Sequence, residues 1–329
     1  MKVLFVGGTG IISSACSELA LERGIELYLL TRGQSIRPVP AGAKVLTADI
    51  NDPSSVVKAL GGINFDAVVD WIAFLPEQVE RDIKLFESIT GQYVFISSAS
   101  AYQKPLAALP ITESTPLKNP FWKYSRDKIA CEDRLVREYR EKDFPITIVR
   151  PSHTYDKTLL PFEGGWTVMD RMLRGKPVIV HGDGTSLWTL THNRDFAKGF
   201  TGLLGNPHAI GETFQITSDE SLTWNQIFET MAHAVGVEPH LIHIPSERIA
   251  MYDEDWGAGL LGDKSYSVVF DNSKIRRLVP DFVCTIPFAQ GAREIASWYM
   301  ADPNRRKVNP ALNLMYEKMI DDYLSSQPD

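Results

Sequence analysis

Cysteine is scarce in this sequence, with three residues in a chain of 329. Cys16, Cys131 and Cys284 lie far apart, and they show neither metal-ligand spacing nor a Cys-His signature. We interpret them as buried thiols in a reducing cytosol. A chain of this length can build a large core, so we expect no disulfide and no structural metal.

Long apolar runs are also absent. No segment approaches the roughly 20 apolar residues that a membrane-spanning helix needs. Met1 and Lys2 lead directly into an apparent core strand, so no signal peptide is expected. We therefore expect a cytoplasmic protein without a membrane partner.

Basic residues are not in excess. The chain has 34 lysines and arginines against 41 acidic residues, a formal net charge of −7. Nucleic acid is bound through clusters of basic side chains, and we find none, so nucleic acid is not expected as the main partner. The length suggests about two domains.

The first thirteen residues carry the clearest pattern. Lys2–Val6 is a short apolar run, closely spaced glycines follow it, and a helical pattern begins at Ile11. A helix N-terminus exposes unpaired N–H groups, and glycines let a pyrophosphate approach the backbone. This strand, turn and helix could be an ordinary α/β connection, but its place at the start of the chain favours a dinucleotide site.

Strand and helix patterns alternate up to about residue 150, which is typical of an α/β fold, a Rossmann-like doubly wound parallel sheet. We predict a dinucleotide-binding domain over 1–155 and a smaller α+β substrate domain over 156–329. The two are partly interleaved, because a helix near 193–205 returns to the sheet. The predicted strands are 2–6, 25–31, 44–47, 66–71, 93–98 and 146–149; helices are predicted from Pro53 and over 77–88 and 122–141.

Three side chains suit hydride chemistry. Tyr124 and Lys128 lie four residues apart on one helix face, and Ser98 ends a predicted strand at the edge where such sheets bind ligands. An ammonium about 6 Å from a phenol stabilises the phenolate by roughly 3 kcal/mol, about two pK units, at an effective dielectric constant of about 20. A Tyr-x-x-x-Lys pair also arises by chance; the serine and the glycine-rich turn favour the functional interpretation.

With these motifs the chain resembles the extended short-chain dehydrogenase/reductase family, in its NAD-dependent epimerase/dehydratase group. The match is good over residues 1–155 and looser beyond, and the N-terminal half is most similar to UDP-galactose 4-epimerase-like members. The resemblance implies that Tyr124 is the catalytic base, Lys128 its partner and Ser98 the residue that holds the substrate oxygen. It also implies that the pyrophosphate is cradled by Gly7, Thr9, Gly10, Ile11 and Ile12.

The same resemblance assigns other cofactor contacts. It places Asp49 and Ile50 against the adenine, and Trp71 and Ala73 where the fourth strand meets the cofactor. Pro151 and His153 fall where the chain passes the nicotinamide, and with Tyr124 and Lys128 they complete the expected binding residues. His153 is either an additional acid or base or a structural histidine.

Departures from the family pattern bear on the cofactor. The third glycine is Ser13 here, which puts the close approach of helix and strand in doubt. The second strand ends in Thr31 instead of an acid, and Arg32 follows at once. The cofactor is therefore NAD or NADP, with a tilt towards NADP if Arg32 pairs with a 2′-phosphate; the alternative is a solvated arginine.

Other departures bear on the reaction. Ala99 and Ser100 replace the Asp-Glu pair of sugar-nucleotide dehydratases, which favours epimerase or reductase chemistry. Trp188 and Leu260 stand where arginines would hold a substrate diphosphate, which weakens a nucleotide-linked substrate. Trp188 either stacks on a sugar or base, or is buried in the core.

We therefore expect an NAD(P)-dependent oxidoreductase or epimerase acting on a hydroxyl or keto group of a sugar-like substrate. The alternative is a non-catalytic, nucleotide-sensing or RNA-associated Rossmann protein, as in the chloroplast stem-loop RNA-binding group. By resemblance, the helices predicted over 77–88 and 122–141 form the interface of a homodimer.

Overall fold

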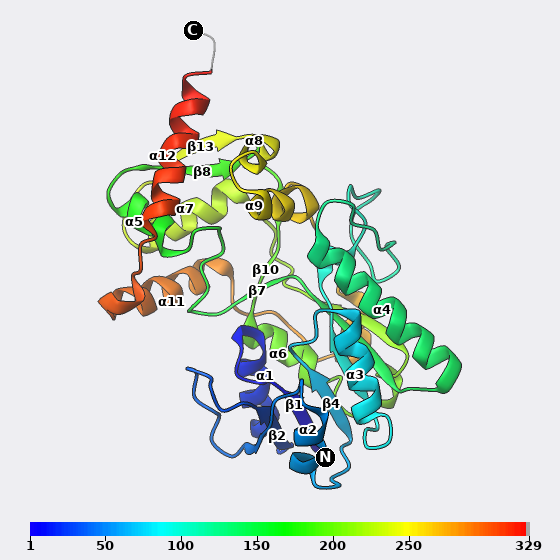
Figure 1. The fold of residues 1–329 in the computed structure, drawn as a ribbon. Helices are drawn as coiled ribbons and strands as arrows, with labels where there is room; N and C mark the ends of the chain where they lie inside the picture. The colour runs from blue at the N-terminus through cyan, green and yellow to red at the C-terminus, as the bar shows by residue number, and fades with distance from the viewer. Residues whose placement is uncertain (327–329) are drawn as a thin grey trace.

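The computed structural model describes residues 1–326 and is built on a seven-stranded, fully parallel sheet with helices on both faces (Figure 1). The strand order is β11-β6-β5-β4-β1-β2-β3, so the chain winds outward in both directions from its first strand, and the predicted Rossmann-like fold is confirmed. The strands are β1 (Lys2–Val6), β2 (Glu26–Thr31), β3 (Lys44–Thr47), β4 (Ala67–Asp70), β5 (Tyr93–Ile96), β6 (Ile146–Pro151) and β11 (Glu212–Ile216).

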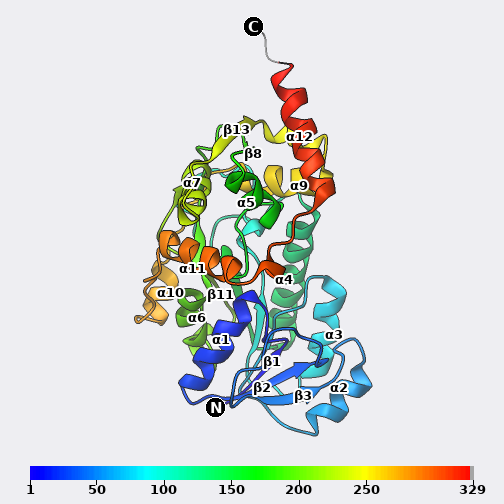
Figure 2. The ribbon, with the colours of Figure 1, turned by 90° about the vertical axis from the view of Figure 1, so that its left-hand side faces the viewer.

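Both faces of this sheet are covered, which explains why its central strands are almost continuously apolar. One face packs against α1 (Ile11–Glu22), α6 (Asn193–Thr201) and α10 (Ser273–Leu278), and the other against α2 (Pro53–Leu60), α3 (Pro76–Phe86) and α4 (Lys123–Lys142) (Figure 2). The predicted start of α2 is confirmed, because the Asp52 carboxylate accepts hydrogen bonds from the backbone N–H groups of Ser54 and Ser55, and Pro53 is the first helical residue.

The seventh strand, β11, was missed by sequence reasoning. It pairs with β6 in parallel, after the chain has already left the sheet and returned through α6, whose return was expected. Gln215, the fourth of the five residues of this strand, is fully buried, and its amide donates to the carbonyl oxygens of Ile111 and Asp271. A buried strand is recognised in a sequence by an uninterrupted apolar run. Gln215 interrupts that run, and its burial is tolerated because its amide donates to carbonyl groups that lie far away in the sequence.

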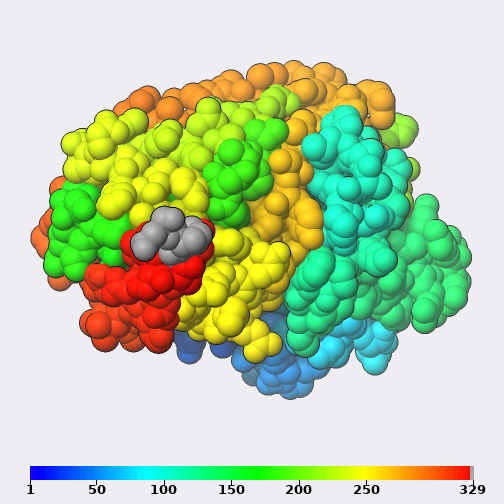
Figure 3. Space-filling view, turned by 90° about the horizontal axis from the view of Figure 1, so that it is seen from above, coloured from blue at the N-terminus to red at the C-terminus, as the bar shows by residue number. Residues whose placement is uncertain are grey.

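Most of the remaining chain forms a second region over the carboxyl ends of the strands, with its own apolar core (Figures 1 and 2). Figure 3 views this region from the side of α12; its yellow-to-red surface adjoins the blue-green segment before α4. The helices are α5 (Trp166–Leu173), α7 (Trp224–Ala234), α8 (Ser246–Ala250), α9 (Glu254–Gly259), α11 (Phe288–Met300) and α12 (Pro310–Leu324). Short strands pair as β7 (His153–Tyr155) with β10 (Leu190–His192), β8 (Pro177–His181) with β13 (His240–Ile244), and β9 (Leu187–Trp188) with β12 (Leu222–Thr223).

Membrane-spanning helices were not expected. Within residues 1–326, none of the helices has both the length and the apolar character needed to cross a bilayer.

Candidate active site

The glycine-rich turn after β1 forms one end of a cavity of about 750 Å³. Gly7 and Gly8 both have φ of +99°, a conformation that residues with a Cβ rarely adopt. A Cβ on Gly8 would also lie 2.6 Å from Cδ2 of Leu29. The turn therefore requires glycine, and it directs the N-terminus of α1 towards the cavity.

Ser13, which stands in place of the family's third glycine, stabilises the turn. Its buried hydroxyl accepts a hydrogen bond of 2.8 Å from the backbone N–H of Gly10, the residue that caps α1. The serine thus stabilises the turn by a hydrogen bond from within the helix. Gly7, Gly8 and Gly10 of the turn still line the cavity.

The carboxyl ends of the central strands supply the other walls. The cavity volume lies within the range of small-molecule and cofactor sites, and the glycine turn with a helix N-terminus at one end fits a dinucleotide. Ten of the expected cofactor residues line it: Gly7, Thr9, Gly10, Ile11, Ile12, Trp71, Tyr124, Lys128, Pro151 and His153.

Four expected cofactor residues do not line the cavity: Arg32, Asp49, Ile50 and Ala73. Arg32 is exposed beyond the end of β2, and residues 34–37 line the cavity in its place. Asp49 accepts a hydrogen bond from the N–H of Asn51, and Ile50 is buried in the core. Ala73 turns its carbonyl oxygen to the Lys128 ammonium, 2.7 Å away, so it positions a site residue.

Ser98 and Tyr124 meet at the edge of this cavity. Ser98 follows β5, and its Oγ lies 2.9 Å from Oγ of Ser100, which in turn accepts a 2.8 Å hydrogen bond from Ser125 on α4. Burial raises the pKa of Tyr124, the nearby Ser98 hydroxyl opposes the rise, and the Asp263 carboxylate adds to it. The phenol is therefore neutral at pH 7.

Lys128 is anchored on two backbone carbonyls. Its Nζ donates to the carbonyl oxygens of Ala73 (2.7 Å) and Ile96 (2.8 Å), and it lies 4.4 Å from the ring centroid of Phe74 and 5.9 Å from that of Tyr124. Burial lowers the pKa of Lys128 to about 8. The expectation that this ammonium lowers the pKa of Tyr124 was wrong for the protein alone, because burial of the phenol raises that pKa.

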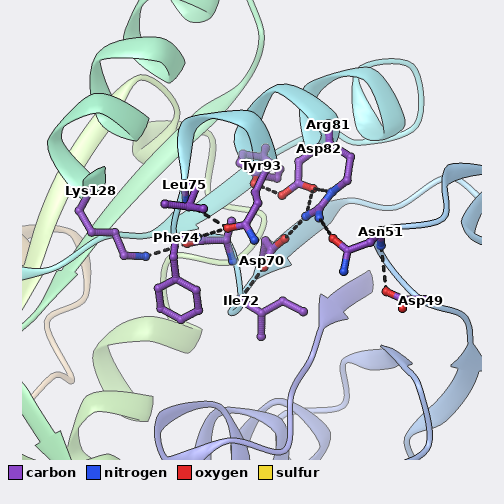
Figure 4. A network of polar contacts seen from close by, with 12 residues as sticks. Asp49, Asn51, Asp70, Ile72, Phe74, Leu75, Arg81, Asp82, Tyr93 and Lys128 are labelled. Atoms are coloured by element: carbon purple, nitrogen blue, oxygen red, sulfur yellow. Dashed lines mark hydrogen bonds and ion pairs between the residues drawn. The ribbon is translucent and has the colours of Figure 1, made fainter. Parts of the chain in front are cut away.

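A buried polar network fixes the turn that supports Lys128 (Figure 4). The Asp70 carboxylate accepts hydrogen bonds from the N–H groups of Ile72 (2.5 Å) and Ala73 (2.9 Å). Arg81 links this carboxylate (3.4 Å) to that of Asp82 (2.7 Å). Burial, and then the neighbouring Asp82, raise the pKa of Asp70. The position of the Ala73 carbonyl, and hence of Lys128, is set by this network.

A second, smaller cavity of about 260 Å³ adjoins the first. The two share a border formed by Ser98, Tyr124, Pro151, Ser152 and His153. The other walls of the small cavity include three aromatic residues, Trp122, Trp188 and Phe270, and two charged ones, Asp263 and Lys264. The arrangement can hold a dinucleotide in the larger cavity and a small molecule in the other, with both hydroxyl groups between them.

His153 is held in one tautomer by Trp188. The indole Nε1–H donates to Nδ1 of His153 over 3.1 Å, and an indole can only donate, so the imidazole proton is on Nε2. Burial, and then the charge of Lys264, lower the pKa of His153 to about 3. His153 is therefore a neutral hydrogen-bond donor and not a base. Trp188 itself is buried against Trp224 and also lines the small cavity.

Several lining residues were missed by sequence reasoning. Ser100, beside the predicted serine, was noted only as a departure from dehydratases, although it bonds Ser98. Arg37, Asp263 and Lys264 come from a loop and from the π-helical turn Leu260–Lys264, and no local pattern marks such segments as part of a site.

Fold and cavity together define a Rossmann-type nucleotide-binding protein. A sequence model of the NAD dependent epimerase/dehydratase family matches residues 3–217. The chain belongs to this family, and its structural likeness is to epimerases of the extended short-chain dehydrogenase/reductase type. The family supports a nicotinamide cofactor and a sugar-modifying enzyme.

Individual relatives are distant. The chain is 24% identical over 288 residues to the 2′-dehydrokanamycin reductase of Streptomyces kanamyceticus, covering 86% of this chain and 80% of that protein. It is 28% identical over 256 residues to the chloroplast stem-loop binding protein of 41 kDa b of Arabidopsis thaliana, covering 74% and 65%. The structure of a Bacillus cereus UDP-glucuronic acid 4-epimerase with UDP-glucuronic acid and NAD superposes with a TM-score of 0.72 at 18% identity, covering 92% and 99%.

Proposed function

We propose that the protein is an NAD(P)-dependent reductase or epimerase that acts on a hydroxyl or keto group of a small, sugar-like substrate. One observation carries this proposal: the hydroxyl groups of Ser98 and Tyr124 lie on the border between the glycine-lined cavity and the small aromatic cavity. A group at that border can act on a substrate and a cofactor at once.

Each residue of the site has a part in this reaction. Bound in the larger cavity, the nicotinamide supplies or accepts the hydride. Ser98 donates a hydrogen bond to the substrate oxygen, and Tyr124 exchanges a proton with that oxygen. Lys128, which is anchored on two carbonyls, would bind the ribose of the cofactor. The Ser98–Ser100–Ser125 chain of hydrogen-bonded hydroxyls fixes the position of the Ser98 hydroxyl.

The raised pKa of Tyr124 favours reduction. A neutral phenol is already an acid, so it can donate its proton to the alkoxide that forms when a carbonyl is reduced. The oxidation half of an epimerase needs the phenolate, which burial disfavours. The relationship to a 2′-dehydrokanamycin reductase agrees with this direction.

We further propose that the cofactor is NADP. β2 ends without an acidic residue, and the loop that follows carries two arginines: Arg37, which lines the cavity, and Arg32, which is exposed at the start of the loop outside the cavity lining. A guanidinium in this loop suits a 2′-phosphate. Fluorescence titration with NADPH and NADH tests this. Tighter NADPH binding that Arg32→Gln weakens is expected; equal affinities contradict the preference.

Isotope transfer tests the reaction. The purified protein is incubated with a panel of keto sugars and cofactor deuterated at nicotinamide C4, and the products are analysed by mass spectrometry. A reductase consumes cofactor and moves deuterium into product, whereas an epimerase inverts a hydroxyl without net consumption. Neither deuterium transfer nor inversion with any panel member, from a protein that binds the cofactor, contradicts enzymatic function.

A non-catalytic, RNA-associated role is the second candidate, and the similarity to a chloroplast stem-loop binding protein favours it. The net charge of −7 opposes it, because RNA binding is driven by phosphate contacts. Filter binding to a stem-loop RNA separates the two: salt-dependent binding by a protein without turnover supports the RNA-associated role.

We also propose a cytoplasmic homodimer built through α3 and α4, which lie side by side on one face of the sheet (Figure 1). Light scattering should give about twice the chain mass; a mass of 36.8 kDa contradicts the dimer.

A further inference from the structure

A short π-helical turn, Leu260–Lys264, forms one wall of the small cavity. The carbonyl oxygen of Lys264 at its end accepts three hydrogen bonds, from Nε2 of His181 (3.1 Å), Oγ of Ser186 (3.2 Å) and Nε1 of Trp224 (3.2 Å). Three donors from separate elements on one carbonyl fix the turn. The side chain that leaves it therefore starts from a defined position at the cavity.

The Lys264 ammonium is not neutralised. Its Nζ lies 5.3 Å from the ring centroid of Trp122 and 6.0 Å from that of Trp188, in cation–π contact with both indoles. Within residues 1–326 it has no carboxylate and no hydrogen-bond acceptor as partner. The adjacent Asp263 pairs instead with the buried Lys104, at 3.2 Å. Aromatic faces attract a cation but carry no net charge, so a positive charge remains on this wall.

This charge lies close to the reacting groups. The ring centroid of Trp122, which carries the Lys264 ammonium on one side, is 4.9 Å from that of Tyr124. Ser98, Tyr124 and Lys264 all line the same cavity of about 260 Å³. A small molecule that places its reacting carbon at Tyr124 therefore brings its other substituents within reach of Lys264.

We propose that Lys264 binds an anionic group, a carboxylate or a phosphate, carried by the same small moiety that bears the reacting hydroxyl or keto group. The proposal rests on the proposed function and names its substrate class as sugar acids or sugar phosphates. His153 is neutral, and the negative charge of Asp263 is balanced by Lys104. The positive charge of Lys264 therefore decides that the ligand carries a negative charge. A neutral sugar would leave the half-buried ammonium without a partner, and a cationic aminosugar would be repelled.

Calorimetric binding of three probes tests the proposal without turnover: glucose, glucuronate and glucose 6-phosphate. In the wild-type protein saturated with reduced cofactor, which cannot oxidise the hydroxyl groups of the probes, at least one anionic probe should bind about tenfold or more tightly than glucose, because hydrogen bonds to charged groups are the strong ones. Lys264→Met and Lys264→Gln should abolish this preference, and Lys264→Arg should retain most of it. Lys58→Met, which removes an exposed lysine of α2, is the matched control.

Each result of this binding experiment supports or overturns the proposal. Equal binding of the three probes, or a preference that survives Lys264→Met, overturns the proposal. Anion binding that is equally lost in Lys58→Met also overturns it, because the effect is then net charge. UDP-glucose serves as a fourth probe, and Lys264-dependent binding of it alone means that the anion is a diphosphate remote from the reacting ring, which contradicts the substrate class. A Lys264-dependent preference without deuterium transfer supports the anion site while the proposed function fails.

Discussion

Arg37 donates to the Asp156 carboxylate and to the Thr158 hydroxyl, both at 2.5 Å, and so joins the loop after β2 to the segment after β7. Residues 34–37 of the first segment line the larger cavity, as does Thr154 in β7, just before the second segment. Burial raises the pKa of Asp156, but the hydrogen bonds from Arg37 and Thr158 outweigh it, and the pKa is lowered overall. The bridge therefore ties together two walls of the proposed cofactor cavity.

Opening this bridge should speed the release of the cofactor. Arg37→Gln and Asp156→Asn are each expected to raise the dissociation rate of NADPH about fivefold, since a partly exposed ion pair contributes about 1 kcal/mol. Stopped-flow displacement measures the rate. Arg140→Gln, an exposed arginine of α4, should leave it unchanged; unchanged release in both bridge variants would contradict the role of the bridge.

The Trp188–His153 hydrogen bond should control the imidazole tautomer. Nitrogen-15 NMR is expected to show His153 as the Nε2–H form in the wild type and a mixture in Trp188→Phe. His153→Gln keeps a donor and should raise KM no more than about fivefold. Because the pKa of His153 is about 3, the pH profile between pH 5 and 8 should not change in this variant. A lost acidic limb would identify His153 as a titrating group.

The buried Lys128 should make the free energy of unfolding depend on pH. Burial lowers its pKa from 10.5 to about 8, so the unfolded chain binds more protons than the folded one between these values, and stability from this group rises with pH there. Urea unfolding of the cofactor-free protein should show the wild type gaining about 2 kcal/mol over Lys128→Met from pH 7 to about pH 9.5. A flat or falling difference contradicts the burial of a charged lysine.

The ion pair of Arg150 with Glu132 is buried beneath the site, and Ser97 also donates to this glutamate. Arg150→Met should lower the free energy of unfolding by about 3–5 kcal/mol, because it leaves the carboxylate buried without its partner. Urea denaturation measures the loss. Asp127→Asn, which breaks the exposed pair with Lys123, should cost less than about 1 kcal/mol; equal losses would contradict the importance of burial.

Local patterns predicted the parts of the fold and site that local physics determines. The first thirteen residues contain an apolar run, glycines that can adopt a positive φ and the start of a helical pattern. The structure has β1, the turn and the beginning of α1 at these places. Tyr124 and Lys128 both line the cavity because a helix places residues four apart on one face.

The remainder depends on contacts between distant segments. Lys264 reaches the cavity from 140 residues beyond Tyr124 on an irregular turn, and β11 is a strand only because β6 offers it an edge. The pKa of Tyr124 could not be obtained from helical spacing, since burial, Ser98 and the distant Asp263 decide it. Arg32, by contrast, was expected in the cavity from its place after β2, but it is exposed and does not line the cavity.

Single-turnover hydride transfer in Tyr124→Phe tests the central claim most directly. The nicotinamide absorbance is followed after mixing the cofactor complex with the most active member of the substrate panel, and cofactor affinity is measured in parallel. We predict a rate lower by roughly 10²–10⁴-fold with unchanged cofactor affinity, the effect of removing a general acid or base. Transfer at the wild-type rate in this variant would contradict the account of Tyr124 as the group that exchanges a proton with the substrate.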